Sequence, residues 1–225
     1  PYTVQLGGGQ RETRLHEESR RQQFMSIADH VLGAIKSWRV YHFHDTSSSA
    51  RVKQQGDLND NQTLRPDASN LAAFLYLLRE TENDHYRKIV STIRLVAPFF
   101  DDFSLRPNPL NQEKIQLEWQ EKGSDTYFNA QTLSDGTLRF MCLATLLLQP
   151  RLPSTIIIDE PELGLHPYAI TMLASLLKSA SQKTQVVVST QSVPLVNQFG
   201  PEEIVVVDRK DGQSTFERRT AKDLE

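Results

Sequence analysis

The sequence has few of the features that form disulfides, membrane-spanning segments or a surface of predominantly one charge. Cys142 is the single cysteine, so an internal disulfide is excluded, and its place in the apolar run FMCLATLLL favours a buried thiol in a reducing cytoplasm. No stretch approaches the roughly 20 apolar residues that cross a bilayer, so we expect no membrane partner. The 25 basic and 28 acidic residues nearly balance, which excludes a global field that attracts nucleic acid.

A GxxxxGK[ST] phosphate loop is also missing from these residues. The glycines at positions 7–9 are followed by Gln10 and Arg11 instead of a lysine and a hydroxyl residue, so they are typical of a loop or linker. Because the chain begins with Pro1, we expect it to be part of a longer polypeptide.

What is present in the N-terminal half is mainly helical spacing. Apolar residues recur at that spacing between Glu17 and Ser37, and VYHFHDT then alternates like a short strand. The segments SNLAAFLYLLRE and HYRKIVSTIRLVAP predict two helices, the first capped by Ser69 and the second stopped by Pro98.

After Pro98 the period of the pattern changes to two. KIQLEW places Ile115, Leu117 and Trp119 on one face, and TYFNA follows a turn at Gly123, which predicts an antiparallel hairpin. Farther on, the apolar runs TIIID, QVVVST and IVVVD alternate with helical segments, which predicts one parallel sheet covered by helices on both faces. The expected fold class is therefore α/β, with an inserted helical lobe and an antiparallel hairpin region.

Asp159 and Glu160 stand where the TIIID strand ends, and ligands of parallel sheets bind beyond the carboxyl ends of the strands. One carboxylate there can hold a hydrated magnesium ion while its neighbour orients or deprotonates a water molecule. An alternative interpretation is that Asp159 and Glu160 are only a solvated pair of carboxylates at the end of the strand.

Two further motifs flank this pair. LSDGTLR places Ser134 and Gly136 at the start of a helix, where a hydroxyl and free N–H groups bind an anion, although an ordinary capped helix has the same pattern. STQS brings Gln191 to the end of a neighbouring strand. Three motifs in this order are more specific than any one of them.

Together, LSDGTLR, TIIIDEP, ELGLH and STQS resemble the signature motif, Walker B motif, D-loop and switch region of ATP-binding-cassette ATPases. With YHFHDTSSSA and SNLAAFLYLL, the chain resembles the RecF-like predicted AAA ATPases of bacteria, which are relatives of the RecF and structural-maintenance-of-chromosomes (SMC) heads. The resemblance covers about Trp38–Arg209 and implies a P-loop NTPase-like fold. It divides the chain into a linker and helix (1–37), a helical lobe (38–98) and an ATPase core (99–225).

The resemblance implies ATP and Mg²⁺ as cofactors and assigns roles to single residues. Asp159 would hold the magnesium ion through water, Glu160 would be the general base, and Gln191 would sense the γ-phosphate in place of the usual histidine. Ser134 and Gly136 would contact the γ-phosphate bound by a second subunit.

The D-loop of the resemblance would cross the dimer interface, and its residues are Leu163, Gly164, Leu165 and His166. Glu162 receives no role, and we interpret it as a surface residue near that interface.

The implied function is an ATP-hydrolysing head that forms an ATP-dependent homodimer and drives a step in DNA metabolism or defence, with DNA or a nuclease or other effector as further partner. Without a phosphate loop, the chain alone is expected to be inactive and to bind ATP poorly. The alternatives are a non-hydrolysing interaction module and a degenerate ATPase homologue. A nuclease of the overcoming-lysogenization-defect type would need an additional acidic metal-binding domain.

The roles of two further sets of residues stay open. His42 and His44 lie on the same face of the VYHFHDT strand and suggest metal ligands together with Asp45, but two ligands on one strand do not make a site without others. Four arginines near the N-terminus either contact DNA phosphates or form a solvated helix face; they are Arg11, Arg14, Arg20 and Arg21.

Overall fold

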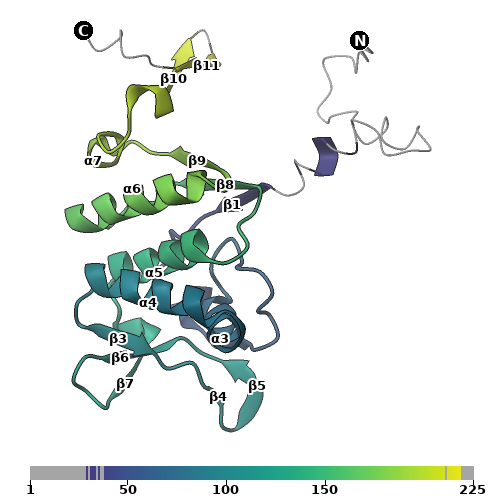
Figure 1. The fold of residues 1–225 in the computed structure, drawn as a ribbon, viewed down its shortest axis with the longest axis vertical. Helices are drawn as coiled ribbons and strands as arrows, with labels where there is room; N and C mark the ends of the chain where they lie inside the picture. The colour runs from purple at the N-terminus through teal and green to yellow at the C-terminus, as the bar shows by residue number, and fades with distance from the viewer. Residues whose placement is uncertain (1–28, 30, 34, 36–37, 211, 219–225) are drawn as a thin grey trace.

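The computed structural model describes residues 29, 31–33, 35, 38–210 and 212–218 (Figure 1). Residues 29, 31–33 and 35 are helical, while most of the helix predicted between Glu17 and Ser37 lies outside the described residues. The glycines at positions 7–9 and the four N-terminal arginines lie outside them as well.

A parallel sheet of three strands carries the motifs. Its order is β1 (Trp38–Tyr41), β8 (Thr155–Asp159) and β9 (Gln185–Ser189), so the Walker B-like strand is central. β8 and β9 are rich in isoleucine and valine, whose branched side chains suit a pleated, buried surface. The parallel sheet flanked by helices was therefore predicted correctly.

The helices α5 (Asp135–Leu148) and α6 (Pro167–Ser181) lie on one side of this sheet (Figure 1). Ile156 and Ile158 are 0% and 1% exposed on that side. The opposite face carries Val40 and Val187, which share a row through Ile157 and are 42% and 45% exposed. Of the two faces expected to be covered, the described helices thus cover one.

The two helices predicted before Pro98 are α3 (Leu71–Thr81) and α4 (Asn83–Val96), and the end of α4 before Pro98 agrees with the prediction. The predicted cap is wrong by one residue, because Asn70 and not Ser69 stands at the N-cap. The Asn70 side chain accepts a hydrogen bond from the Arg65 N–H and donates to the carbonyl oxygens of Asp60 and Thr63, so it holds the preceding loop instead of the helix.

Two antiparallel sheets lie at the far end of the molecule, in the orders β2-β5-β4 and β3-β6-β7 (Figure 1). The predicted hairpin is the pair β6–β7, and Ile115, Leu117 and Trp119 are buried as expected. KIQLEW, however, is divided between β5 and β6, which belong to different sheets. The strands are β2 (Gly56–Asp57), β3 (Phe100–Phe103), β4 (Pro107–Asn108), β5 (Asn111–Ile115), β6 (Glu118–Glu121) and β7 (Tyr127–Asn129).

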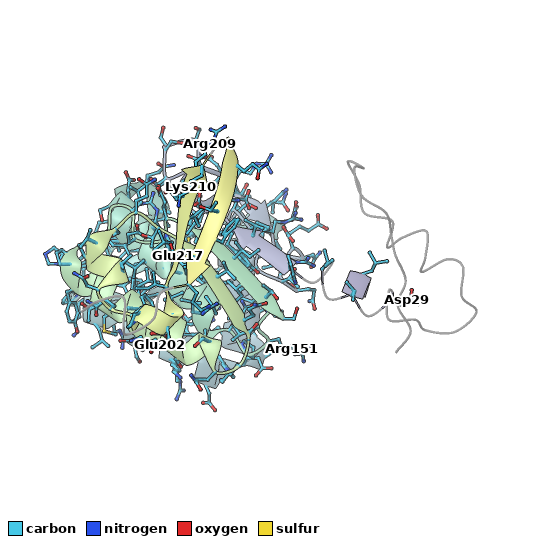
Figure 2. All side chains as sticks on the ribbon, turned by 90° about the horizontal axis from the view of Figure 1, so that it is seen from above. Asp29, Arg151, Glu202, Arg209, Lys210 and Glu217 are labelled. Atoms are coloured by element: carbon cyan, nitrogen blue, oxygen red, sulfur yellow. The ribbon has the colours of Figure 1, made fainter. Side chains whose placement is uncertain are left out.

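The C-terminal strands form a hairpin of their own. After α7 (Val193–Val196), β10 (Val205–Lys210) pairs antiparallel with β11 (Gln213–Arg218), so the prediction that IVVVD joins the parallel sheet is wrong. Gly212 has φ +78° beside the reversal of the chain, a conformation that glycine adopts without strain. Figure 2 shows Arg209, Lys210 and Glu217 along this hairpin.

One hydrophobic cluster joins the helices to the sheets and includes Phe43, Leu75, Phe140 and Ile158. Three short 3-10 helices complete the connections: η1 (Arg51–Lys53), η2 (Ala130–Thr132) and η3 (Pro201–Glu203). Among the described helices, none combines the length and the apolar character needed to cross a membrane. The division of the chain at residues 37 and 98 stays a prediction.

Candidate functional site

Asp159 and Ser189 occupy the same register position at the carboxyl ends of β8 and β9. The Ser189 hydroxyl donates a hydrogen bond to Asp159 Oδ1, and the Asp159 side chain is 49% exposed. Since Oδ1 already has this donor, Oδ2 is the oxygen that faces His44, whose Nε2 lies 3.7 Å away. The strand end therefore presents one oriented carboxylate at the surface.

Glu160 has a backbone conformation that few residues with a side chain adopt. Its φ is +39°, in the left-handed region, and its N–H donates to the Ser189 carbonyl oxygen at 2.8 Å. This hydrogen bond ties the turn after β8 to the end of β9. Such strain is concentrated at functional sites, where the surrounding structure holds it in place.

Glu162 joins the same two strand ends. Its Oε1 accepts a hydrogen bond from the Thr190 hydroxyl, whose oxygen in turn accepts from the Ser192 N–H at 2.9 Å. Its Oε2 is enclosed and has no hydrogen-bond partner within the described part of the chain. Glu162 is partly exposed, but its carboxylate reaches to the loop after β9, so it has structural contacts that its interpretation as a surface residue without a role did not include.

Ser134 is the N-cap of α5, as the LSDGTLR pattern suggests. Its Oγ accepts a hydrogen bond from the Thr137 N–H at 3.2 Å and lies 2.8 Å from Thr137 Oγ1. Ser134 is nevertheless an exposed residue, so the start of α5 lies at the surface. Asp135, the next residue, lies 3.9 Å from the buried Lys53 ammonium group.

Gly136 packs against residues 164 and 165 of its own chain, in the segment predicted to be the D-loop. A Cβ atom placed on Gly136 would lie 2.3 Å from the carbonyl oxygen of Gly164, much closer than any real Cβ contact. Gly164 itself has φ +74°, which glycine tolerates best. Both glycines are thus needed where α5 meets the loop after β8.

Arg139 is a structural residue of the site that sequence reasoning missed. It is 5% exposed, and its guanidinium donates to the carbonyl oxygens of Phe43 at 2.9 Å, His44 at 3.2 Å and Leu163. Burial lowers the pKa of this guanidinium from its usual range. A charged residue within the apolar helix LRFMCLATLLL was the signal that could have pointed to such a role.

The other predicted residues lie around these contacts. Leu163 is 49% exposed and Leu165 is 9% exposed, so they face opposite environments. His166 is the N-cap of α6, and its Nδ1 accepts from the Tyr168 N–H at 3.4 Å. Gln191 is exposed in the loop after β9.

His42 and His44 lie beside Asp159, not beside Asp45. The Asp45 carboxylate accepts hydrogen bonds from the Ser47 N–H and hydroxyl at 3.1 and 2.7 Å. One ligand atom from each of His42, His44 and Asp159 lies within 4.8 Å of the other two. The suggestion that Asp45 completes the pair is therefore wrong, and the third group comes from the end of β8.

Comparisons with known proteins identify the family of the chain and structures with a similar fold. Residues 9–197 match the model of a family described as "AAA domain, putative AbiEii toxin, Type IV TA system". No curated protein matches the sequence.

Solved structures of SMC ATPase heads are similar in fold. One, described under "ATP-driven dimerization and DNA stimulated activation of SMC ATPases", is 18% identical, with 67% of this chain and 92% of that chain covered and a TM-score of 0.50. An SMC head bound to the C-terminal winged-helix domain of ScpA is 16% identical, with coverages of 82% and 56% and a TM-score of 0.56.

A third structure, an SMC head of Pyrococcus furiosus with an extended coiled coil, bound to the C-terminal domain of ScpA, is 17% identical, with coverages of 71% and 43% and a TM-score of 0.52. The chain therefore spans less than two thirds of the two ScpA-bound chains. These likenesses confirm the predicted P-loop NTPase-like fold.

Proposed function

Because the chain belongs to the AbiEii-type AAA domain family, we propose that it is the ATP-hydrolysing head of an ATPase whose complete form closes as a dimer around ATP. The observation that carries the proposal is the joint of β8 and β9, where Ser189 binds both Asp159 and the backbone of Glu160. Ligands of parallel sheets bind beyond the carboxyl ends of the strands, and at this strand end the two acidic residues differ in backbone conformation, because Glu160 alone has a positive φ.

Asp159 fits the role of a magnesium-binding residue. Carboxylate oxygens are the ligands that Mg²⁺ prefers, and the ion keeps several waters of its own. The Ser189 hydroxyl fixes the Asp159 carboxylate, and its half-exposed side chain leaves room for those waters. When bound, Mg²⁺ neutralises charge that develops on the β- and γ-phosphate oxygens.

Glu160 would accept the proton of the attacking water. The left-handed turn and the hydrogen bond to the Ser189 carbonyl oxygen hold its backbone apart from that of Asp159, which supports a separate task for its carboxylate. Gln191 follows β9 in an exposed loop, where its amide would donate a hydrogen bond to the γ-phosphate.

The second half of each site would come from the partner subunit. Ser134 is exposed at the start of α5, a helix of 14 residues, where the hydroxyl and the free N–H groups can stabilise phosphate charge. The contact of Gly136 with Gly164 couples this helix to Leu163–His166, the segment that we propose to cross the interface. A structural neighbour described as showing ATP-driven dimerisation supports this view by analogy of fold.

We propose that a further segment supplies the phosphate loop, and one edge and one face of the sheet could receive it. Among the described strands, β9 pairs only with β8, and the sheet face with Val40 and Val187 is half-exposed. Parallel sheets are normally covered on both faces. We propose that a strand and helix bearing the phosphate loop cover this edge and face, and that the chain alone binds ATP weakly.

The setting that we propose is DNA metabolism or defence, with DNA or an effector protein as the further partner. The rival function is a non-hydrolysing interaction module, which would use the same exposed sheet face to dock a protein. ATP hydrolysis separates the two.

The deciding experiment compares Glu160→Gln with Glu113→Gln in the protein that includes the phosphate-loop segment. Removal of a general base lowers turnover by about 10²–10⁴-fold, while ATP should still bind and close the dimer, as seen by size-exclusion chromatography with light scattering. Glu113 is exposed on β5, far from the strand ends, and its variant should keep full turnover. Near-normal turnover of Glu160→Gln would assign Glu160 to a solvated strand end.

A further inference from the structure

We propose that His42, His44 and Asp159 bind a divalent transition-metal ion, a property that ATP hydrolysis with Mg²⁺ does not require. The three side chains come from the ends of two neighbouring strands, since the histidines follow β1 and Asp159 ends β8. Imidazole nitrogen suits Zn²⁺, Co²⁺ and related ions, whereas Mg²⁺ prefers oxygen ligands alone. The inference concerns metal binding itself and does not rest on the proposed function.

The three ligand atoms lie close enough together for side-chain rotation to bring them to one metal ion. His44 Nε2 and Asp159 Oδ2 are 3.7 Å apart, and all three ligand atoms lie within 4.8 Å of one another. In a tetrahedral site with bonds of about 2.0–2.1 Å, neighbouring ligand atoms are about 3.3 Å apart. We therefore expect side-chain rotations to bring the three ligand atoms to these distances around one ion.

The backbone that carries the histidines is fixed on both sides. Tyr41 and Phe43 are 2% and 6% exposed and alternate with the histidines, so both imidazoles face away from the core. The His42 N–H donates to the Pro66 carbonyl oxygen at 2.9 Å, and Arg139 holds the carbonyl oxygens of Phe43 and His44. Preorganisation of this kind lowers the entropy cost of binding a metal.

Ser189 orients the third ligand from behind. Its hydroxyl donates to Asp159 Oδ1 and leaves Oδ2 on the side of His44. Partners of this kind, which orient a ligating carboxylate, strengthen metal binding. The negative charge of Asp159 also offsets that of the cation, while the Arg139 guanidinium is engaged with three carbonyl oxygens.

Three protein ligands leave coordination positions open. Structural zinc sites use four protein ligands, whereas sites with three keep a position for water or another ligand. The site is also at the surface, with the His44 and Asp159 side chains 34% and 49% exposed. We therefore expect an exchangeable ion with at least one bound water, and not an ion needed for folding.

The test uses Co²⁺ as a spectroscopic probe on the metal-free chain without nucleotide. The expected result is one Co²⁺ per chain with visible absorption bands, which Zn²⁺ displaces at equimolar concentration and Mg²⁺ does not displace in large excess. His42→Gln, His44→Gln and Asp159→Asn should each weaken binding by at least about tenfold, because a ligand contributes no less than the groups that orient it.

His85→Gln is the matched control. His85 lies on α4 with its Nδ1 3.9 Å from Glu82 Oε2, so it represents a surface histidine beside a carboxylate outside the site. Its variant should bind Co²⁺ like the original chain. Equal binding by a folded His42→Gln/His44→Gln double variant, or loss of binding in His85→Gln, would overturn the inference. Turnover with Mg²⁺ is measured separately, so failure of either proposal is visible without the other.

Discussion

The first turn of α5 touches the loop after β8 at Gly136 and Gly164, so closely that a Cβ on Gly136 would lie 2.3 Å from the Gly164 carbonyl oxygen. The contact joins the predicted signature motif to the predicted D-loop within one chain. A backbone atom cannot move away as the end of a flexible side chain can. The two segments therefore cannot approach each other more closely, and a side chain at position 136 would push them apart.

Gly136→Ala should destabilise the fold, although alanine is the better helix former. Overpacking of this kind costs about 1–3 kcal/mol, and each kcal/mol lowers the Tm of a chain of this size by about 2–4 °C. Thermal unfolding monitored by circular dichroism measures the change. Gly56→Ala is the control, because the nearest atom to its added Cβ would be 3.7 Å away. A Tm for Gly136→Ala at or above that of the parent would show that the close approach is absent.

Arg139 makes the second connection between these segments, and Arg139→Lys tests it. A lysine ammonium is a compact charge and cannot replace a planar guanidinium that donates hydrogen bonds to three carbonyl oxygens. Leaving buried acceptors unpaired costs about 1–3 kcal/mol. Urea denaturation should show the loss, while Arg87→Lys, at an exposed position of α4, should lie within about 0.5 kcal/mol of the parent. Equal stability of the two variants would contradict the role of Arg139.

The sequence predicted well what depends on local pattern. The apolar runs TIIID and QVVVST became β8 and β9, the helix expected within LSDGTLR is α5 with Ser134 as its N-cap, and Pro98 followed the end of α4. These features depend on the period of the apolar residues, on helix caps and on the residues at strand ends, all of which can be recognised in a single sequence. The fold class followed from the same signals.

What the sequence did not predict depends on pairing across long separations. IVVVD has the composition of a buried parallel strand, yet β10 pairs with its neighbour β11. Asp159 meets His44 because β1 and β8 are adjacent, although more than a hundred positions separate them in the chain. A glutamate is usually a surface residue. The carboxylate of Glu162 turns inward because it accepts a hydrogen bond from Thr190, which follows the neighbouring strand β9.

Thr190→Val tests the contact between Glu162 and the loop after β9. The change removes the donor to Glu162 Oε1 and leaves both carboxylate oxygens without a donor among the described residues, at a cost of about 1–3 kcal/mol. Thr126→Val, at an exposed position, should change stability little.

A double-mutant cycle assigns the cost of Thr190→Val to Glu162. In a Glu162→Met background no carboxylate remains to be left unpaired, so Thr190→Val should then cost clearly less than in the parent chain. Urea denaturation of the four proteins measures the coupling. If Thr190→Val costs the same in both backgrounds, the hydrogen bond to Glu162 does not contribute to stability.

The proposed sharing of active sites predicts complementation between two inactive variants of the complete protein. Ser134→Asp keeps a good N-cap for α5 but places a negative charge where the partner's γ-phosphate is proposed to lie. Glu160→Gln removes the proposed base. Each homodimer should be inactive. A purified mixed dimer with one of each has one site with both defects and one with neither, so about half of the parental ATPase activity should return if the sites act independently.

The control is a mixed dimer of the parent chain with the Ser134→Asp/Glu160→Gln double variant. In a shared arrangement each of its sites has one defect, so it should be inactive although it contains the same substitutions in the same number. In a self-contained arrangement the parent subunit stays active. Both mixed dimers must first be shown to close on ATP by light scattering. If the control dimer hydrolyses ATP and the first mixed dimer does not, Ser134 and Glu160 act in the site of the same subunit, which would contradict the shared arrangement.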